Sequence, residues 1–173
     1  MKISIIIPWY NEEEVLPLTF ERLNSLCVDL LSNEDCDDVE FVMVDDGSQD
    51  RTAELLAEAS NVNKRFKLIR FSRNFGHQAA LLAGYEFAKG DVIVSLDADL
   101  QDPPELIKTM LEKIKEGNDV VYAARQSRKN DSWFKCKTAD LFYWLMKKFG
   151  ADIIPNHADF RMVTRRALNA FLQ

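Results

Sequence analysis

Residues 92–117, VIVSLDADLQDPPELIKTMLEKIKEG, place a short apolar run directly before a helical pattern. Val92–Leu96 has the near-continuous apolar character of a strand that is buried on both faces of a parallel sheet. Pro103 and Pro104 suit the entry to a helix. The apolar residues that follow recur at helical spacing: Leu106, Met110, Leu111 and Ile114. The stretch therefore predicts a strand followed by a helix.

The same alternation extends over the rest of the chain. Further apolar runs predict strands at 3–8, 39–44, 66–71 and 120–123, and helical patterns lie at 13–31, 50–65 and 76–89. Thr164 can cap one more helix, which runs through Leu168 and Leu172. Repeated strand–helix–strand units imply a right-handed, doubly wound α/β sheet. No internal repeat or linker divides the 173 residues, a length that is usual for one domain.

The composition indicates a globular protein that does not bind nucleic acid. Hydrophobic residues make up 47% of the chain and charged residues 29%, while the net charge of −6 disfavours non-specific nucleic-acid binding. The charge is uneven, because seven basic and two acidic residues between Arg125 and Lys148 give that segment +5 and leave −11 elsewhere. The three cysteines, Cys27, Cys36 and Cys136, lack a metal-ligand spacing and are expected to be reduced thiols.

Acidic residues follow three of the first four predicted strands. Ligands of open α/β sheets bind beyond the carboxyl ends of the strands, and none of these ends carries the glycine-rich turn of a dinucleotide site. The strongest signal is Asp97-Ala98-Asp99, with Gln101 two residues further on. Residues two apart in an extended chain point the same way, so Asp97 and Asp99 could bind one Mg²⁺ or Mn²⁺, and Gln101 could complete the ligands. Such a cation would neutralise a diphosphate leaving group.

Two other strand ends have both a structural and a functional interpretation. Residues 45–50, DDGSQD, could form a turn and a helix cap, or Asp45 could accept the imide N–H of a uracil-type base. After the first strand, acidic residues from Glu12 onward favour a helix N-terminus. Tyr10 could also stack on a base, and Asn11 or Glu12 could bind a ribose.

Single residues elsewhere carry weaker signals. Arg73 could contact a phosphate, whereas His77 is more typical of a helix start or a core position. Downstream, Arg125 and Arg128 suit bidentate phosphate contacts, and Asp159 could serve as a general base. Taken alone, each of these charged residues is more typical of a surface salt bridge.

The segment Trp133–Phe149 combines aromatic and basic residues. One helical stripe in it would pack on the domain, but residues 141–146 are six apolar residues in a row, more than one stripe can bury. Their lysine neighbours favour a helix at an anionic membrane surface, and a subunit interface in a homo-oligomer is the competing explanation. No run approaches the ~18 apolar residues of a membrane span.

Four motifs together resemble the family-2 glycosyltransferases with the GT-A fold, and more narrowly the polyprenyl-phosphate glycosyltransferases. They are IPWYNE at 7–12, DDGSQD at 45–50, NFGHQ at 74–78 and DADLQDPP at 97–104. The resemblance implies a Rossmann-like, three-layer α/β/α fold with a mostly parallel central sheet. It also implies one catalytic domain over residues 1–173, truncated before C-terminal membrane helices. The implied reaction is a metal-dependent, inverting transfer from a nucleotide-diphosphate sugar, UDP-sugar rather than GDP-sugar, to polyprenyl phosphate at the cytoplasmic membrane face.

The resemblance also assigns residues to roles. The nucleotide-sugar positions are Pro8, Tyr10, Asn11, Glu12, Asp45, Asp46, Arg73, Asp97, Ala98 and Asp99. Metal binding is assigned to Asp97, Asp99 and Gln101, acceptor phosphate to Arg125 and Arg128, and catalysis to Asp159, Arg125 and Arg161. The family pattern varies around the Asp159 motif, where this chain has Ala158 before and Phe160 after. A lipid phosphate is largely dianionic at pH 7, so Asp159 would orient substrate more than remove a proton.

Alternative functions fit parts of the sequence. A peripheral transferase that extends a cell-surface glycan would keep the same donor site and would need Asp159 as a true base. A non-catalytic nucleotide-sugar sensor would keep Asp45 and Asp97 but would have no use for Trp133–Phe149. A nucleotidyltransferase would need a loop rich in glycine, lysine and arginine after the first strand, which Tyr10-Asn11-Glu12 does not supply.

Overall fold

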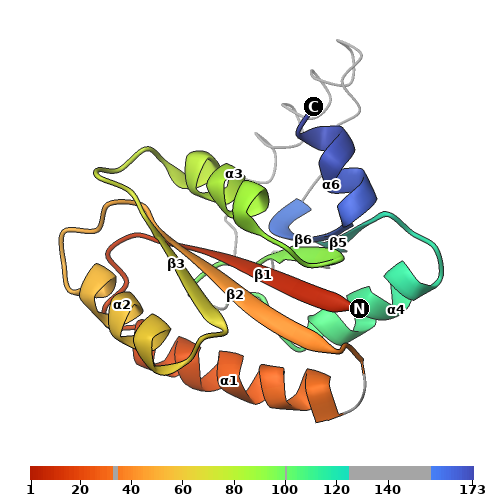
Figure 1. Cartoon of the computed structure of the whole chain (residues 1–173), viewed down its shortest axis with the longest axis horizontal. Helices are drawn as coiled ribbons and strands as arrows, with labels where there is room; N and C mark the ends of the chain where they lie inside the picture. The colour runs from red at the N-terminus through yellow and green to blue at the C-terminus, as the bar shows by residue number, and fades with distance from the viewer. Residues whose placement is uncertain (33–34, 100, 125–156) are drawn as a thin grey trace, which may run out of the picture. The chain divides into compact units, whose positions relative to one another are not determined.

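A computed structural model describes residues 1–32, 35–99, 101–124 and 157–173, without the side chains of 124 and 157–159 (Figure 1). The chain divides into two compact units. The first joins Met1–Tyr122 to Asp159–Gln173, and the second is Ala123–Ala158. The described helices and most of the described sheet belong to the first unit. Arg125, Arg128 and the segment Trp133–Phe149 lie outside the described residues.

Strands and helices alternate along the described chain until the last strand. The elements are β1 (Lys2–Trp9), α1 (Leu16–Ser32), β2 (Asp38–Asp45), α2 (Thr52–Val62), β3 (Phe66–Arg70), α3 (His77–Phe87), β4 (Val92–Ser95), α4 (Leu106–Lys115), β5 (Val120–Ala124), β6 (His157–Thr164) and α6 (Arg165–Phe171). The sheet order is β3-β2-β1-β4-β6-β5. The predicted helices exist but are shorter at one or both ends, because turns take up their first residues: the N–H of Leu16 donates to Glu12 O at 3.1 Å.

The central sheet is mostly parallel, as the sequence predicted. β1 pairs in parallel with β2 and β4, β2 pairs in parallel with β3, and β4 pairs antiparallel with β6. The register joins Trp9 to Asp45 and Asp45 to Arg70. The carboxyl ends of β1, β2 and β3 therefore lie level along one edge of the sheet.

Helices cover both faces of this sheet within the first unit (Figure 1). One face carries α3 and α6, whose Leu81 and Leu168 share a core cluster with Ile6 and Val42 of the sheet. The other face carries α1, α2 and α4, and an aromatic group there joins Phe20 of α1 to the sheet, 6.0 Å from the Trp9 ring and 5.1 Å from the Phe66 ring. The predicted three-layer α/β/α architecture is confirmed.

A buried carboxylate stabilises the amino-terminal edge of the sheet. Glu40 is 5% exposed and accepts hydrogen bonds from Ser4 Oγ at 2.6 Å and from the Lys89 N–H at 2.8 Å. Its Oε2 also lies 2.8 Å from Lys2 Nζ. Burial pushes the pKa of Glu40 upward, but these hydrogen bonds and the Lys2 charge outweigh it, so the pKa lies below its ordinary value of 4.5.

Of the last two elements, the sequence predicted the helix α6 but not the strand β6. Thr164 caps α6 as predicted, since its side chain accepts a hydrogen bond from the Ala167 N–H at 3.2 Å. The strand β6 was not predicted, although the buried positions Phe160 and Met162 alternate as they do in a strand. Within the described ranges, no helix is both long enough and apolar enough to cross a bilayer.

Candidate functional site

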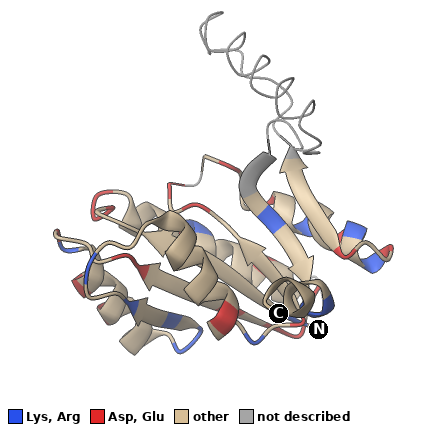
Figure 2. Ribbon diagram, turned by 90° about the horizontal axis from the view of Figure 1, so that it is seen from above, with Lys and Arg blue, Asp and Glu red and all other residues tan. Residues whose placement is uncertain are grey.

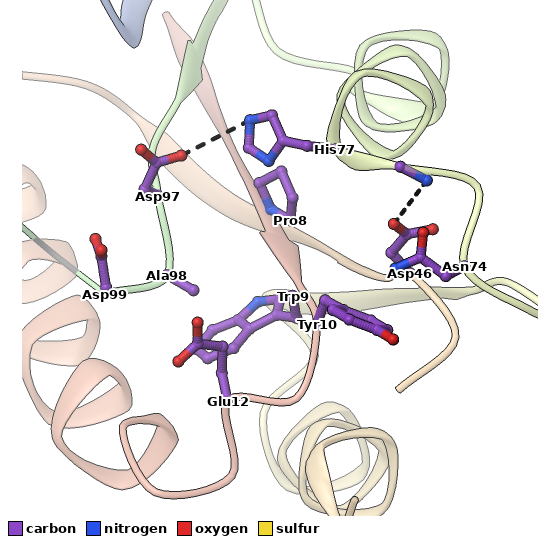
Figure 3. A pocket seen from close by; sticks show the side chains of 11 residues that line it. Pro8, Trp9, Tyr10, Glu12, Asp46, Asn74, His77, Asp97, Ala98 and Asp99 are labelled. Atoms are coloured by element: carbon purple, nitrogen blue, oxygen red, sulfur yellow. Dashed lines mark hydrogen bonds and ion pairs between the residues drawn. The ribbon is translucent and has the colours of Figure 1, made fainter. Parts of the chain in front are cut away.

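A cavity of about 390 Å³ opens at the carboxyl edge of the sheet (Figure 3). This volume falls in the range of small-molecule sites. The described residues that line it are Pro8, Trp9, Tyr10, Glu12, Asp46, Asn74, Gly76, His77, Asp97, Ala98 and Asp99. They come from the end of β1, from the loops that follow β1, β2, β3 and β4, and from the start of α3, so the cavity lies where open α/β sheets bind ligands.

Seven of the residues assigned to a nucleotide sugar from sequence line this cavity. They are Pro8, Tyr10, Glu12, Asp46, Asp97, Ala98 and Asp99. The other three, Asn11, Asp45 and Arg73, are not among the described lining residues and make contacts of other kinds.

The loops after β1 and β2 bind each other through Asn11. This residue has a φ of 54°, a left-handed conformation that asparagine tolerates better than most residues. Its N–H donates to Ser48 Oγ at 3.0 Å, and its Oδ1 accepts from the Gln49 N–H at 2.8 Å. The Glu12 N–H donates to Thr52 Oγ1 at 2.8 Å. Asn11 therefore helps to fix the loop from which Tyr10 and Glu12 reach the cavity.

The two neighbouring aspartates after β2 lie in different places. Asp45 is fully buried, its Oδ1 accepts from the Ser48 N–H at 3.1 Å, and its Oδ2 lies 3.5 Å from Arg70 Nε without a hydrogen bond among the described residues. Asp46 lines the cavity, and its two oxygens accept from the N–H groups of Phe75 at 2.7 Å and Gly76 at 2.9 Å. Of the two aspartates, Asp46 lines the cavity and Asp45 lies buried behind it, and a role of Asp45 in nucleotide binding stays a prediction.

Arg73 lies on the outside of the loop after β3. Its guanidinium carbon is 4.2 Å from the centroid of the Phe75 ring, which is 51% exposed. This cation–π contact holds Arg73 to the protein surface next to the cavity.

The acidic pair after β4 contributes both its carboxylates to the cavity. The loop is held from α1, because Thr19 Oγ1 donates to Ala98 O at 2.9 Å. The Asp97 carboxylate turns toward the His77 ring, with 3.8 Å between Oδ1 and Nε2 (Figure 3). Asp99 Oδ1 accepts from the Gln101 N–H at 3.1 Å, so the backbone of Gln101 orients Asp99, and the Gln101 side chain is not among the described lining groups.

Negative charge accumulates in the cavity. Four of the described lining residues are Asp or Glu and none is Lys or Arg. Burial raises the pKa of Glu12, and the carboxylates of Asp99 and Asp50 raise it further. In Figure 2, acidic segments mark the loops at this edge of the sheet. A bound cation would relieve the repulsion.

The oxygen donors suit a hard divalent cation that also binds phosphate. Within the described part of the chain, no group of three His, Cys, Asp or Glu side chains is already gathered around one metal-sized point. Mg²⁺ typically uses one or two protein carboxylates and completes its octahedron with water and substrate phosphates. Asp97 and Asp99 fit that requirement when a phosphate-bearing ligand occupies the cavity.

β6 directs the second predicted catalytic segment toward the same edge. Arg161 pairs with Ser95, the last residue of β4, in an antiparallel register. The residues just before Arg161, which include Asp159, therefore run past the end of β4 in the direction of Asp97. Arg161 Nε donates to the hydroxyl of Tyr85 at 3.0 Å, which holds the guanidinium against α3.

Four lining residues were absent from the predicted site: Trp9, Asn74, Gly76 and His77. His77 was interpreted as a helix start or a core residue. It does begin α3, but it also faces the cavity. The sequence position of His77 could have indicated its place in the site, because it follows a glycine at the start of a predicted helix, after a predicted strand. In the structure this glycine, Gly76, has a φ of 96° and directly precedes α3.

Curated relatives match almost the whole chain. A glycosyltransferase of Bacillus subtilis, YkcC, whose function is uncharacterised, is 47% identical over 96% of this chain and 50% of its own length. The undecaprenyl-phosphate 4-deoxy-4-formamido-L-arabinose transferase of Proteus mirabilis is 39% identical over 99% of this chain and 52% of its own. The chain thus spans about half the length of the curated relatives it matches.

Solved structures share the fold. Residues 1–349 of TarS from S. aureus in complex with UDP-GlcNAc align with a TM-score of 0.57 and 28% identity over 76% of this chain and 36% of that chain. The mannosyltransferase PcManGT of Pyrobaculum calidifontis, in complex with GDP-Man and Mn²⁺, has a TM-score of 0.61 over 98% of this chain and 46% of that chain. At 18% identity it shows the fold alone.

The family assignment rests on a family model that matches most of the chain. The model of Glycosyl transferase family 2 covers residues 4–171, which include all the described lining residues and all the described helices and strands except the first two residues of β1. The resemblance seen in the four sequence motifs is confirmed. The chain belongs to glycosyl transferase family 2.

Proposed function

We propose that the chain is the catalytic domain of a divalent-metal-dependent, inverting glycosyltransferase that transfers a sugar from a nucleotide-diphosphate sugar to polyprenyl phosphate. The observation that carries this proposal is the cavity at the carboxyl edge, where the carboxylates of Asp97 and Asp99 face the same space as Tyr10 and Asp46. Asp97 and Asp99 would hold a cation that binds the diphosphate. Tyr10 would offer an aromatic ring to the base, and Asp46 would offer it a hydrogen-bond acceptor.

The nucleoside part of the donor would lie on the β1 and β2 side. The Tyr10 side chain is 41% exposed, so its ring is available for stacking on a base. Asp46 is held by the two N–H groups of the loop after β3 and can still accept a hydrogen bond from a base imide. A UDP-sugar is favoured over a GDP-sugar, which the UDP-GlcNAc complex of TarS supports.

The diphosphate would lie on the β4 side. A Mg²⁺ or Mn²⁺ ion would be held by Asp97 and Asp99, with Gln101. The ion would neutralise the negative charge that develops on the departing diphosphate. Thr19 contributes by fixing the intervening Ala98 carbonyl, so the two aspartates keep their positions.

The acceptor would approach from the β6 side. A lipid phosphate has a second pKa near 6 and is largely dianionic at pH 7, so it attacks the sugar without losing a proton. Asp159 would then orient the substrate, while Arg161 and the arginines Arg125 and Arg128 would contact phosphate. The undecaprenyl-phosphate transferase of Proteus mirabilis, similar over 99% of this chain, supports this class of acceptor.

The membrane placement is part of the same proposal. Trp133–Phe149 would lie at the cytoplasmic face of the membrane, or alternatively between subunits of a homo-oligomer.

The test is a transfer assay on the full-length gene product. UDP- and GDP-sugars are supplied in turn with Mg²⁺ or Mn²⁺ and undecaprenyl phosphate, and the lipid-linked sugar is followed. We expect product with at least one UDP-sugar and none after chelation of the metal. Product on an added glycan instead of the lipid would favour the glycan-extending alternative. Absence of lipid-linked sugar with every donor would reject the proposal.

A further inference from the structure

The side chain of Trp9 carries a buried hydrogen-bond donor without a partner. Trp9 is the last residue of β1 and is 1% exposed, and its Nε1 is inaccessible to water. Among the described residues nothing accepts a hydrogen bond from it. Buried polar groups in native proteins are nearly always paired, because an unpaired one loses its hydration without compensation. An unpaired donor at this position therefore requires an explanation.

The position of the ring supplies one. Trp9 lines the cavity, and in Figure 3 its indole lies between Tyr10 and Ala98, with the ring nitrogen on the edge nearer to Ala98. The ring packs against Phe20 of α1, whose ring centroid is 6.0 Å away. This packing fixes the indole, with its one polar atom, at the cavity wall.

The surroundings define the chemistry of a partner. The neighbouring polar side chains in the cavity are mainly acceptors, with four carboxylates and no Lys or Arg among the described lining residues. A neutral N–H donor in such a place suits an oxygen atom, and a nucleotide brings oxygens on its ribose and its phosphates.

We propose that Nε1–H of Trp9 donates a hydrogen bond to an oxygen of the bound nucleotide. This hydrogen bond would position the nucleotide sugar in the cavity. This inference rests on the proposed function, because it requires a nucleotide in the cavity. Since Nε1 is covered in the free chain, the group that covers it must shift when the nucleotide binds.

The experiment compares nucleotide binding by the wild-type chain and Trp9→Phe. Calorimetric titration with UDP in MgCl₂ is expected to show affinity weakened about 5- to 100-fold, the effect of one hydrogen bond to a polar or charged oxygen. Uridine, titrated in parallel, separates the two sources of oxygen: a loss with both ligands indicates ribose or base, and a loss with UDP alone indicates phosphate. Phe20→Leu is the matched control, because it repacks the same ring but keeps the N–H, and its UDP affinity should stay within about twofold of wild type.

A second measurement does not depend on the folding of any variant. In the wild-type chain, the indole N–H signal of Trp9 should move downfield in a ¹H–¹⁵N spectrum when UDP and Mg²⁺ are added. Equal UDP affinity in Trp9→Phe and wild type, or an unmoved indole signal under saturating UDP, would overturn the assignment of Trp9 while leaving the proposed function intact. Failure of the wild-type chain to bind UDP with any metal would reject both.

Discussion

Among the described glycines, Gly47 is the one at which an added methyl group would meet the closest backbone atoms. It has a φ of 70°, and a Cβ on it would lie 2.3 Å from the carbonyl carbon of Arg73 and 2.7 Å from the Asn74 nitrogen. Both atoms belong to the backbone of the loop after β3, so no side-chain rotation can relieve the overlap. The Gly47→Ala variant therefore has to separate the loops that follow β2 and β3.

The cost follows from the contacts between these loops. Ordinary carbon–carbon contact needs roughly 1 Å more separation than 2.3 Å, and the same shift would stretch the Asp46 hydrogen bonds of 2.7 and 2.9 Å past their useful range. Hydrogen bonds to a charged group contribute about 1.5–3 kcal/mol each, and a left-handed alanine adds about 1–2 kcal/mol. We expect Gly47→Ala to lower the free energy of unfolding by about 4 kcal/mol or more.

Urea denaturation followed by circular dichroism measures the free energy of unfolding of Gly47→Ala, and Gly117→Ala is the matched control. Gly117 also has a positive φ, 102°, but a Cβ there would meet nothing within 4 Å, so only backbone strain of about 1–3 kcal/mol is expected. The folded fraction of Gly47→Ala should also bind UDP more weakly, because the shifted loop carries Asn74 and His77 away from the cavity. Equal destabilisation by the two substitutions would refute the argument that the loops are in backbone contact.

The remaining predictions concern pH, catalysis and the membrane. Glu40→Gln should lower the free energy of unfolding at pH 7, and the deficit should shrink as the pH falls below 4.5, because a carboxylate with a lowered pKa stabilises the fold only while it is ionised; a pH series of urea titrations measures this. In the transfer assay with a lipid phosphate acceptor and saturating metal, Asp159→Asn should reduce turnover far less than Asp97→Ala or Asp99→Ala; equal losses would contradict the positioning role. Deletion of Trp133–Phe149 should preserve UDP binding but abolish transfer to undecaprenyl phosphate in vesicles; preserved transfer would exclude the segment as a membrane contact.

Much of the fold could be predicted because its determinants are local. Each parallel strand in the centre of the sheet is a near-continuous apolar run, interrupted in β1 by Ser4 and in β2 by Glu40, and each following helix has its own periodicity. β6 was missed because it pairs antiparallel with β4, a pairing between segments distant in sequence that no local pattern encodes. Its alternating Phe160 and Met162 became interpretable only once the neighbouring strand was known.

Some residues of the candidate site could be predicted from sequence and others could not. Strand ends could be located from sequence, so Pro8, Glu12 and Asp97 were predicted to lie in the region that forms the cavity. Which of two adjacent aspartates faces the cavity depends on the path of the turn, and the structure places Asp45 inside and Asp46 at the cavity wall. Trp9 was missed because a buried aromatic residue at a strand end has the appearance of core, and its unpaired nitrogen is visible only in three dimensions.

Nucleotide binding that depends on a divalent cation is the most direct test of the central claim. Calorimetric titration of the chain with UDP should give a binding isotherm in Mg²⁺ or Mn²⁺ that disappears in EDTA. Asp99→Asn should weaken the affinity at least tenfold, since it removes a proposed metal ligand. Glu54→Gln, which alters a carboxylate on α2 that is 71% exposed and does not line the cavity, should match the wild type. UDP affinity that is unchanged by EDTA and by Asp99→Asn would contradict the account.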